Sequence, residues 1–161
     1  MKGLFWNSRG LADLAKQRFL AETTLEHHLD FIALLETGRD NFTSHFLQTL
    51  TSGVEFDWHI LPPRGRSGGI LLGVRCETLE VLNVVHGDFL VKFRVRSKLD
   101  GFRWSLVAVY GAAQPKLKPD FLADLVRICG DENLSILVGG ILISSGEEMK
   151  RTMTILMDDG P

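Results

Sequence analysis

The alternation of apolar and polar residues predicts one layered α+β domain in which helices and strands follow one another along the chain. A short apolar strand over 3–6 precedes a helix over 12–28, where apolar residues recur three and four positions apart, and an unbroken apolar strand over 30–35 follows. A crossover helix returns the chain to the same side of a sheet, and strands buried on both faces read as continuous apolar runs. We therefore expect 3–6 and 30–35 to form a parallel pair.

Further helices and strands are indicated along the rest of the chain. The expected helices cover 42–50 and 117–129, and the expected strands cover 54–61, 70–74, 77–85, 89–96, 102–110 and 134–138. Strict alternation over 89–96 predicts an antiparallel strand with one face in solvent, and Asp100-Gly101 after it is a strong hairpin signal. The run 134–138 is typical of another buried strand.

Composition narrows the class of protein. With 161 residues, 45% of them apolar, 24% charged and a net charge of −2, the chain is expected to fold as a single domain without a global field that attracts nucleic acid or membranes. No apolar run has the length of a signal peptide core or a membrane span, so we expect an intracellular protein of the cytoplasm or nucleus. Cys76 and Cys129 lack metal-ligand spacing and are predicted to be buried free thiols.

Three polar residues end predicted strands. Asn7 follows the first strand and Glu36 the second, and ligand sites in such sheets gather at the carboxyl ends of parallel strands. Asn7 also suits a turn, whereas a carboxylate after the apolar run 31–35 must be solvated, paired or bound to a metal. Tyr110, the only tyrosine, ends the strand 102–110 and is either a packed aromatic residue or part of this group.

Basic residues form two further candidate sites. Arg64 and Arg66 stand in a glycine-rich turn that is either solvated or suited to a phosphate. Lys92, Arg94 and Arg96 share the predicted solvent face of 89–96 and are candidates for weak nucleic-acid binding. The five histidines show no metal-ligand spacing, and we assign none of them to a site.

Five short motifs carry a resemblance over residues 1–140. "WNSRG", "LLETG", "GRSGGILL", "VAVYG" and "ILVGG", in this order, resemble the endonuclease/exonuclease/phosphatase superfamily, in particular the endonuclease domains of plant non-LTR retrotransposons. The resemblance implies the amino-terminal part of a four-layer α/β/β/α sandwich with two mixed sheets, and Mg²⁺-dependent hydrolysis of phosphodiesters in DNA. It also implies that Asn7 binds metal and phosphate, Glu36 is a metal ligand, Tyr110 contacts the scissile phosphate, and the turn 67–69 is structural.

The chain departs from the superfamily pattern after "ILVGG". Relatives continue as Gly-Asp-Phe-Asn, whose Asp orients or deprotonates the attacking water and whose Asn binds the phosphate, whereas this chain has Ile141-Leu142-Ile143, which can do neither. The superfamily's later Asp and Asp-His pair are also missing. We therefore expect a truncated domain over 1–140 with little or no hydrolysis and leave open whether it is an enzyme. The alternative is a residual, non-catalytic nucleic-acid-binding module with DNA as a possible partner.

The tail over 141–161 has its own interpretation. If codons for Asp-Phe-Asn-Ile-Ile are read one nucleotide late, they give Ile-Leu-Ile-Ser-Ser, the sequence of 141–145. The same shift applied to Asn-Asn-Asp-Asn-Phe-Asp-Gly-Arg-Trp-Pro gives 152–161. We infer that the tail is an out-of-frame reading of an ancestral endonuclease gene and expect it to be poorly ordered.

Overall fold

The computed structural model describes residues 1–63, 68–111, 115–130, 132–141 and 153–157. Its first sheet has the strand order β3-β4-β2-β1-β9. The strands are β1 (Lys2–Asn7), β2 (Phe31–Leu35), β3 (Phe56–Leu61), β4 (Ile70–Arg75) and β9 (Met153–Met157), and the helices beside them are α1 (Leu14–His27) and α2 (Ser44–Leu50). The strands β1 and β2 are parallel, as predicted, whereas β4 and β9 run antiparallel to their neighbours, so the sheet is mixed.

The second sheet has the strand order β5-β6-β7-β8. Its strands are β5 (Leu79–His86), β6 (Leu90–Ser97), β7 (Arg103–Tyr110) and β8 (Ser135–Ile141), and the short 3-10 helix η1 (Pro115–Leu117) leads into α3 (Lys118–Cys129). The predicted hairpin forms between β6 and β7, whose turn is closed by a hydrogen bond from the Gly101 amide to the Ser97 carbonyl. Since β7 and β8 are parallel and the other pairs antiparallel, this sheet is also mixed.

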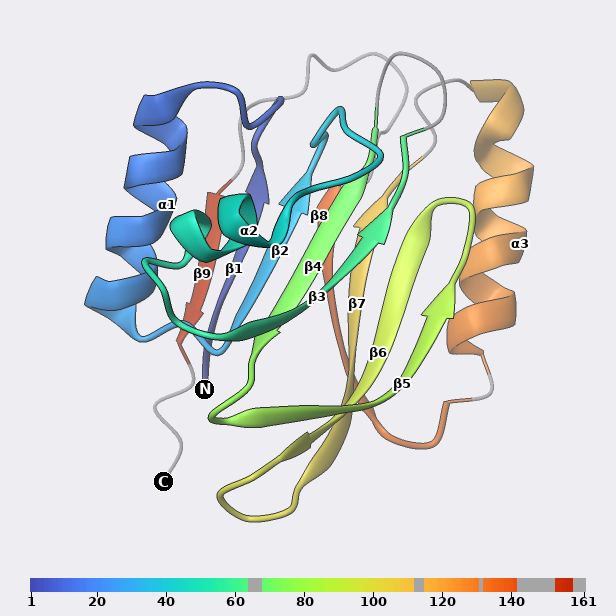
Figure 1. The fold of residues 1–161 in the computed structure, drawn as a ribbon. Coiled ribbons are helices and arrows are strands. Elements are labelled where there is room, and N and C mark those ends of the chain that lie inside the picture. Colours follow the sequence, from blue (N-terminus) through green and yellow to red (C-terminus); the bar gives the residue numbers. More distant parts are fainter. Residues whose placement is uncertain (64–67, 112–114, 131, 142–152, 158–161) are drawn as a thin grey trace.

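Three apolar clusters show that the elements stack in four layers (Figure 1). One cluster fills the space between the sheets and includes Phe5 and Phe31 from the first sheet and Phe93 and Leu106 from the second. A second cluster lies between the first sheet and the helices α1 and α2, and a third between the second sheet and α3. The predicted fold class, part of an α/β/β/α sandwich with two mixed sheets, is therefore confirmed.

The two faces of β6 differ from the sequence prediction. Lys92, expected in solvent, is only 5% exposed, and Leu90 on the same face is fully buried. The reason is tertiary: α3 packs over this end of the strand, and Leu90 joins Phe121 and Ile128 in one cluster. Only Arg94 on this face is exposed, so the expectation of a solvated strand face was wrong for its first half.

The strand β8 is also less buried than its apolar sequence predicts. Ile136 and Val138 are 37% and 48% exposed, although β8 pairs with β7 in parallel over its whole length. The register places Val138 beside Val107, on the face that α3 covers above β6 and β7. The other face, at Gly139, lies against the Phe5 ring between the sheets. Apolar sequence alone therefore did not distinguish a covered strand from this half-covered one.

Part of the predicted tail is paired in a sheet. Residues 153–157 form β9, antiparallel to β1, with Leu4 opposite Ile155. The edge of β1 next to β9 offers a row of backbone groups, and the β-branched and apolar residues of "MTILM" suit such an edge. The expectation that 141–161 is poorly ordered stays a prediction, and 142–152 and 158–161 lie outside the described residues. The out-of-frame origin stays a prediction.

Candidate active site

The three polar strand ends singled out from the sequence meet at one end of the sandwich. Asn7 is the last residue of β1, Glu36 directly follows β2, and Tyr110 is the last residue of β7. Side chains of a strand alternate between its faces, so Asn7 points to the same side as Phe5, into the space between the sheets. The Tyr110 hydroxyl donates a hydrogen bond of 2.9 Å to Oε1 of Glu36 and so joins the two sheets. We call Asn7, Glu36 and Tyr110 the rim.

Asn7 has an amide that is buried without a partner. The residue is 2% exposed, and neither Oδ1 nor Nδ2 has a hydrogen-bond partner within the described part of the chain. Its backbone is well fixed, because β1 pairs with β2 up to Asn7 and Leu35 and the next amide, that of Ser8, donates to the Leu35 carbonyl. Buried polar groups are almost always paired with protein, water or an ion. Within the described residues the Asn7 amide therefore leaves both of its polar atoms to water, an ion or a polar ligand.

Glu36 is held in an unusual backbone conformation. Its φ is 55°, in the left-handed region that residues other than glycine enter at a cost of about 1–3 kcal/mol. The conformation is fixed from one side by the Gly10 amide, which donates a hydrogen bond of 2.7 Å to the Glu36 carbonyl. Such strain collects at functional sites, where the surrounding structure enforces it. Here it turns the carboxylate toward Tyr110 instead of continuing the strand.

A glycine turn packs against the back of the rim. The amides of Thr37 and Gly38 donate to the carbonyls of Gly69 and Gly68 over 3.4 and 3.2 Å. Both turn glycines have positive φ, and a Cβ on Gly69 would lie 2.6 Å from Oγ1 of Thr37. Gly68 lies against the Tyr110 ring, which a Cβ would contact at 3.5 Å. The turn is thus structural at these two positions, and Ser67 lies outside the described residues.

The donors at the rim set a limit on metal binding. Among the residues that the structure describes, no three histidines, cysteines or carboxylates gather around one point. The rim offers one carboxylate, from Glu36, and one amide oxygen, from Asn7.

Cys76 and Cys129 are free thiols, partly rather than fully buried, and burial raises the pKa of each.

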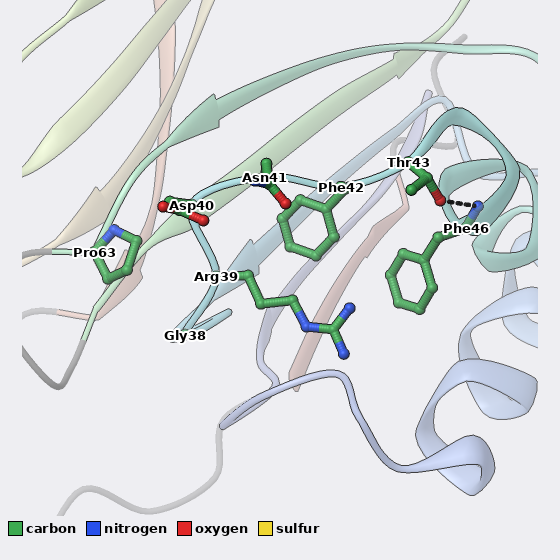
Figure 2. A pocket seen from close by; sticks show the side chains of 8 residues that line it. All are labelled: Gly38, Arg39, Asp40, Asn41, Phe42, Thr43, Phe46 and Pro63. Carbon is green, nitrogen blue, oxygen red and sulfur yellow. Dashed lines mark hydrogen bonds between the residues drawn. The ribbon is translucent and has the colours of Figure 1, made fainter.

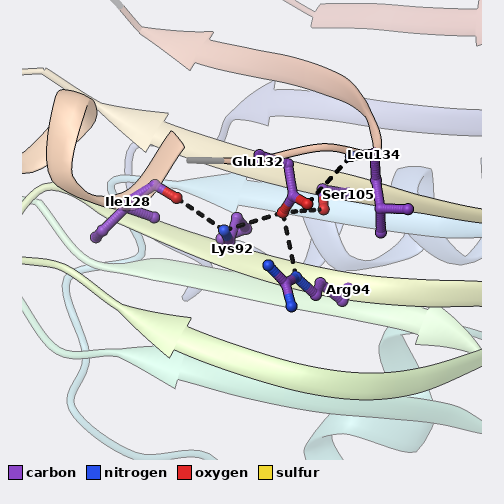
Figure 3. Close-up of polar contacts among 6 residues, drawn as sticks. All are labelled: Lys92, Arg94, Ser105, Ile128, Glu132 and Leu134. Carbon is purple, nitrogen blue, oxygen red and sulfur yellow. Dashed lines mark hydrogen bonds and ion pairs between the residues drawn. The ribbon is translucent and has the colours of Figure 1, made fainter. Parts of the chain in front are cut away.

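The basic residues predicted on β6 lie away from the rim and each has an acidic partner. Lys92 and Arg94 bind the same oxygen of Glu132 at 3.0 and 3.2 Å, and Arg96 pairs with Glu80. Figure 3 shows Glu132 as the centre of this group, with further hydrogen bonds from the Ser105 hydroxyl and the Leu134 amide. Lys92 also donates to the Ile128 carbonyl at the end of α3.

The electrostatics of Glu132 follow from these contacts. Its side chain has no exposed area, and burial by itself would raise its pKa. The hydrogen bonds from Ser105, Lys92, the Leu134 amide and Arg94 outweigh burial and lower the pKa to about 2. Sequence reasoning missed this residue, because Glu132 follows α3 with nothing in its neighbourhood to mark it. The cluster ties α3 to β6 and β7, and the nucleic-acid role of Lys92, Arg94 and Arg96 stays a prediction.

The two arginines of the glycine-rich turn, Arg64 and Arg66, lie outside the described residues. Among the described helices, none is long and apolar enough to cross a membrane.

Solved structures resemble this arrangement of strands and helices. They include the catalytic domain of human Nocturnin with bound sulfate (TM-score 0.66, 15% identity) and an endonuclease/exonuclease/phosphatase family protein from Bacteroides thetaiotaomicron (0.65, 12%). A third is D. rerio TDP2 in complex with a single-strand DNA product (0.61, 16%). Each match covers 87% of this chain.

The chain has the endonuclease/exonuclease/phosphatase fold. It covers 62% of the Nocturnin and Bacteroides chains and 59% of the TDP2 chain, which is less than two thirds of each. No protein-family model matches the sequence, and no curated protein sequence matches it. At sequence identities of 12–16% the similarity establishes the fold. It does not establish the activity of this chain.

Proposed function

We propose that this chain is an incomplete endonuclease/exonuclease/phosphatase domain that binds phosphate and a divalent cation at its rim but hydrolyses phosphodiesters slowly or not at all. Its ancestor, in this proposal, was a Mg²⁺-dependent DNA endonuclease of the retrotransposon kind. The observation that carries the proposal is the buried, unpartnered amide of Asn7 beside the hydrogen-bonded pair of Glu36 and Tyr110.

The rim residues fit a magnesium ion that keeps most of its water ligands. Mg²⁺ takes oxygen ligands, keeps several of its waters and is commonly held by only one or two carboxylates. The Glu36 carboxylate and the Asn7 amide oxygen would hold it, and Asn7 has no competing partner within the described residues. When bound, the ion would polarise a phosphoryl oxygen. With a single carboxylate, we expect weak and mainly hydrated binding.

The chain's own residues supply binding more readily than proton transfer. The Asn7 Nδ2 group is free to donate to a phosphate oxygen, and the Tyr110 hydroxyl, which now donates to Glu36, lies where it can turn to a phosphate. Hydrolysis also needs a group that takes a proton from water. The register of β7 and β8 sets Ile141 opposite Tyr110, at the position for which the superfamily resemblance implies an aspartate.

The isoleucine at this position is the reason for expecting little activity. Ile141 ends β8 at the same end of the sheet as Tyr110, so the superfamily's proton acceptor would sit close to the rim. An isoleucine has no oxygen or nitrogen in its side chain and cannot fill that role. Groups that act as a catalytic unit lose most of their rate when one member is removed. The surviving function is then binding.

A second candidate is a non-catalytic nucleic-acid-binding module. The complex of TDP2 with single-strand DNA supports it, because that protein binds DNA with the same fold. Arg94 and Arg96 are the partly exposed basic residues of β6 that such a surface would use, although both have acidic partners. A salt-dependent affinity that falls when these two charges are removed would distinguish this surface from the rim.

Two measurements test the proposal. First, the unfolding midpoint of the chain is recorded with and without MgCl₂ and inorganic phosphate, for the wild type and Glu36→Gln, since a ligand of the folded state raises stability. We expect a Mg²⁺-dependent increase in the wild type and a smaller one in the variant. An equal increase in both would contradict a metal at Glu36.

Second, supercoiled plasmid is incubated with the chain and Mg²⁺. We expect no nicking beyond the buffer control. Nicking that depends on Glu36 would show an active nuclease and would overturn the statement about activity while leaving the metal site in place.

A further inference from the structure

A cavity opens beside the rim, in the segment that follows Glu36. It has a volume of about 720 Å³ and is lined by residues of the loop before α2, by Phe46 within α2 and by Pro63 after β3. Figure 2 shows these side chains around the cavity. The lining residues are Gly38, Arg39, Asp40, Asn41, Phe42, Thr43, Phe46 and Pro63. The cavity is open to solvent, because Arg39, Asp40, Asn41 and Thr43 in its lining are exposed. We call it the Arg39 pocket.

Two phenylalanine rings lie next to an arginine side chain in this pocket. The rings of Phe42 and Phe46 stack with their centroids 5.6 Å apart, and the Arg39 guanidinium lies 5.9 and 5.1 Å from these centroids. Arg39 is exposed, and no carboxylate pairs with it among the described residues. The rings therefore contact a guanidinium whose hydrogen-bonding groups remain available, and an exposed contact of this kind is a weak attraction. A guanidinium plane is a stacking surface for nucleobases.

The charges in the pocket favour a base over a phosphate. Asp40 and Asn41 line the same cavity as Arg39, so its two formal charges cancel and the carboxylate would repel a second anion. The Asp40 oxygens can accept, and the Asn41 amide can both donate and accept, hydrogen bonds from the edge of a base. In Figure 2 the Asp40 carboxylate lies near Pro63, apart from the Arg39 guanidinium, so the polar groups border the cavity from two sides.

The pocket also lies at a suitable distance from the rim. Arg39 is three residues after Glu36, and three extended residues span at most about 10 Å. Successive phosphates of a stacked strand are about 3.4 Å apart along the helix axis, so the pocket is within about three nucleotides of a phosphate at the rim. Hydrogen bonds from the Thr37 and Gly38 amides to the glycine turn hold the start of this segment in place.

We propose that the Arg39 pocket receives an unpaired nucleobase of the strand whose phosphate is held at the rim. The base stacks on the Arg39 guanidinium, and Asp40 and Asn41 contact its edge. The occupant is a single strand, because a base in a duplex is paired and stacked and cannot enter without leaving the helix. This inference rests on the proposed function, since the rim supplies the phosphate contact, and it adds the substrate class: single-stranded or locally unpaired nucleic acid.

The test is equilibrium binding of fluorescent oligonucleotides to the full chain in the presence of Mg²⁺. The probes are a short oligothymidylate, an abasic strand with the same number of phosphates, and a duplex of the same length. The variants are Arg39→Ala and Arg39→Lys, which keeps the charge but not the planar group. The control is Arg103→Ala, which removes an equal charge from an exposed position at the other end of β7. Unfolding midpoints verify that all variants fold.

A specific pattern is expected. Loss of one base-stacking contact weakens binding roughly tenfold, so both Arg39 variants bind the oligothymidylate about tenfold more weakly than Arg103→Ala does. For the abasic strand, Arg39→Ala has the affinity of Arg103→Ala, and Arg39→Lys has that of the wild type. The wild type prefers the single strand to the duplex. The inference is overturned if the Arg39 and Arg103 variants bind the oligothymidylate alike, or if the abasic strand shows the same loss.

The same assay separates this inference from the function of the rim. Glu36→Gln is expected to weaken the oligothymidylate and the abasic strand equally, because it acts on the phosphate and its cation. If Glu36→Gln has no effect on either strand while Arg39→Ala does, the proposed rim function fails and the base pocket stands. If Arg39→Ala has no effect while Glu36→Gln does, the rim stands and the pocket fails.

Discussion

Replacement of Asn7 by leucine is expected to stabilise the ligand-free protein. The two side chains have the same branching and the same number of heavy atoms, but leucine is the larger because its two methyl groups stand on a tetrahedral carbon, so the change leaves no cavity and adds some packing strain. In the structure both polar atoms of Asn7 are buried without partners among the described residues. A buried group left unpaired costs about 1–3 kcal/mol, and full burial of a leucine side chain contributes about 1.5–3 kcal/mol. Since part of this gain offsets strain from imperfect packing, we expect a net stabilisation of about 2 kcal/mol.

Urea unfolding gives the measurement. The midpoint should rise while the slope stays the same, because the surface exposed on unfolding is unchanged. The comparison is repeated with MgCl₂ and inorganic phosphate, which should raise the midpoint of the wild type more than that of Asn7→Leu. The gain in stability and the loss of ligand response would then come from one side chain, as expected where a site is kept for binding at the expense of stability.

Two threonines provide matched controls for the same reasoning. Thr37 is buried and its hydroxyl also lacks a partner within the described residues, so Thr37→Val should leave stability unchanged or raise it. The hydroxyl of Thr24, equally buried, donates to the Leu20 carbonyl over 2.8 Å, so Thr24→Val should lose about 1 kcal/mol. If Asn7→Leu destabilises the protein by as much as Thr24→Val does, the Asn7 amide is satisfied in solution and the argument for a ligand there is refuted.

Three other changes have defined outcomes. Glu132 has a folded-state pKa of about 2, below its ordinary 4.5, so its stabilising contribution is present above pH 4.5 and is lost as the pH falls from 4.5 towards 2. After allowance for screening near the surface the loss should be on the order of 1–2 kcal/mol, and Glu132→Gln should flatten this part of the curve of unfolding free energy against pH. Gly69→Ala should destabilise the fold by about 2–4 kcal/mol in chemical denaturation, because its Cβ would lie 2.6 Å from Thr37 and its φ is 92°. Tyr110→Phe removes the hydrogen bond to Glu36 and should cost about 1.5 kcal/mol, and an unchanged midpoint would show that the bond contributes nothing in solution.

Most of the fold could be predicted from local patterns because each element carries its own signal. The parallel pair β1 and β2, the hairpin of β6 and β7, and the amphipathic α3 all occur within a few residues of the predicted bounds. The errors concern which face of a strand is covered, and that depends on elements distant in sequence. Lys92 reads as a solvent residue in its strand, yet α3 and Glu132 enclose it. Alternation of apolar and polar residues predicts which face of a strand a residue lies on. It does not predict whether another element covers that face.

One part of the candidate site could be predicted from the sequence and another part could not. Asn7, Glu36 and Tyr110 could be selected from the sequence because each ends a strand, and strand ends are fixed by the pattern of the strand before them. The Arg39 pocket could not be selected from the sequence, because it is formed by residues of the loop after Glu36 together with Phe46 in α2 and Pro63 after β3. A weak signal was present in the spacing of Arg39, Phe42 and Phe46, which places a cation and two aromatic rings close together in the sequence.

The structure also explains how binding could outlast catalysis in such a chain. The two proposed ligands are positioned by contacts that do not involve the end of β8. Pairing of β1 with β2 positions Asn7, and hydrogen bonds with the Gly10 amide and the Tyr110 hydroxyl position Glu36. In the proposed ancestor the proton acceptor stood at the position of Ile141, the last residue of β8, which pairs with Tyr110 within the second sheet. Under the proposed function, a change of sequence that begins at 141 would remove the proton acceptor without disturbing the hydrogen bonds that shape the rim.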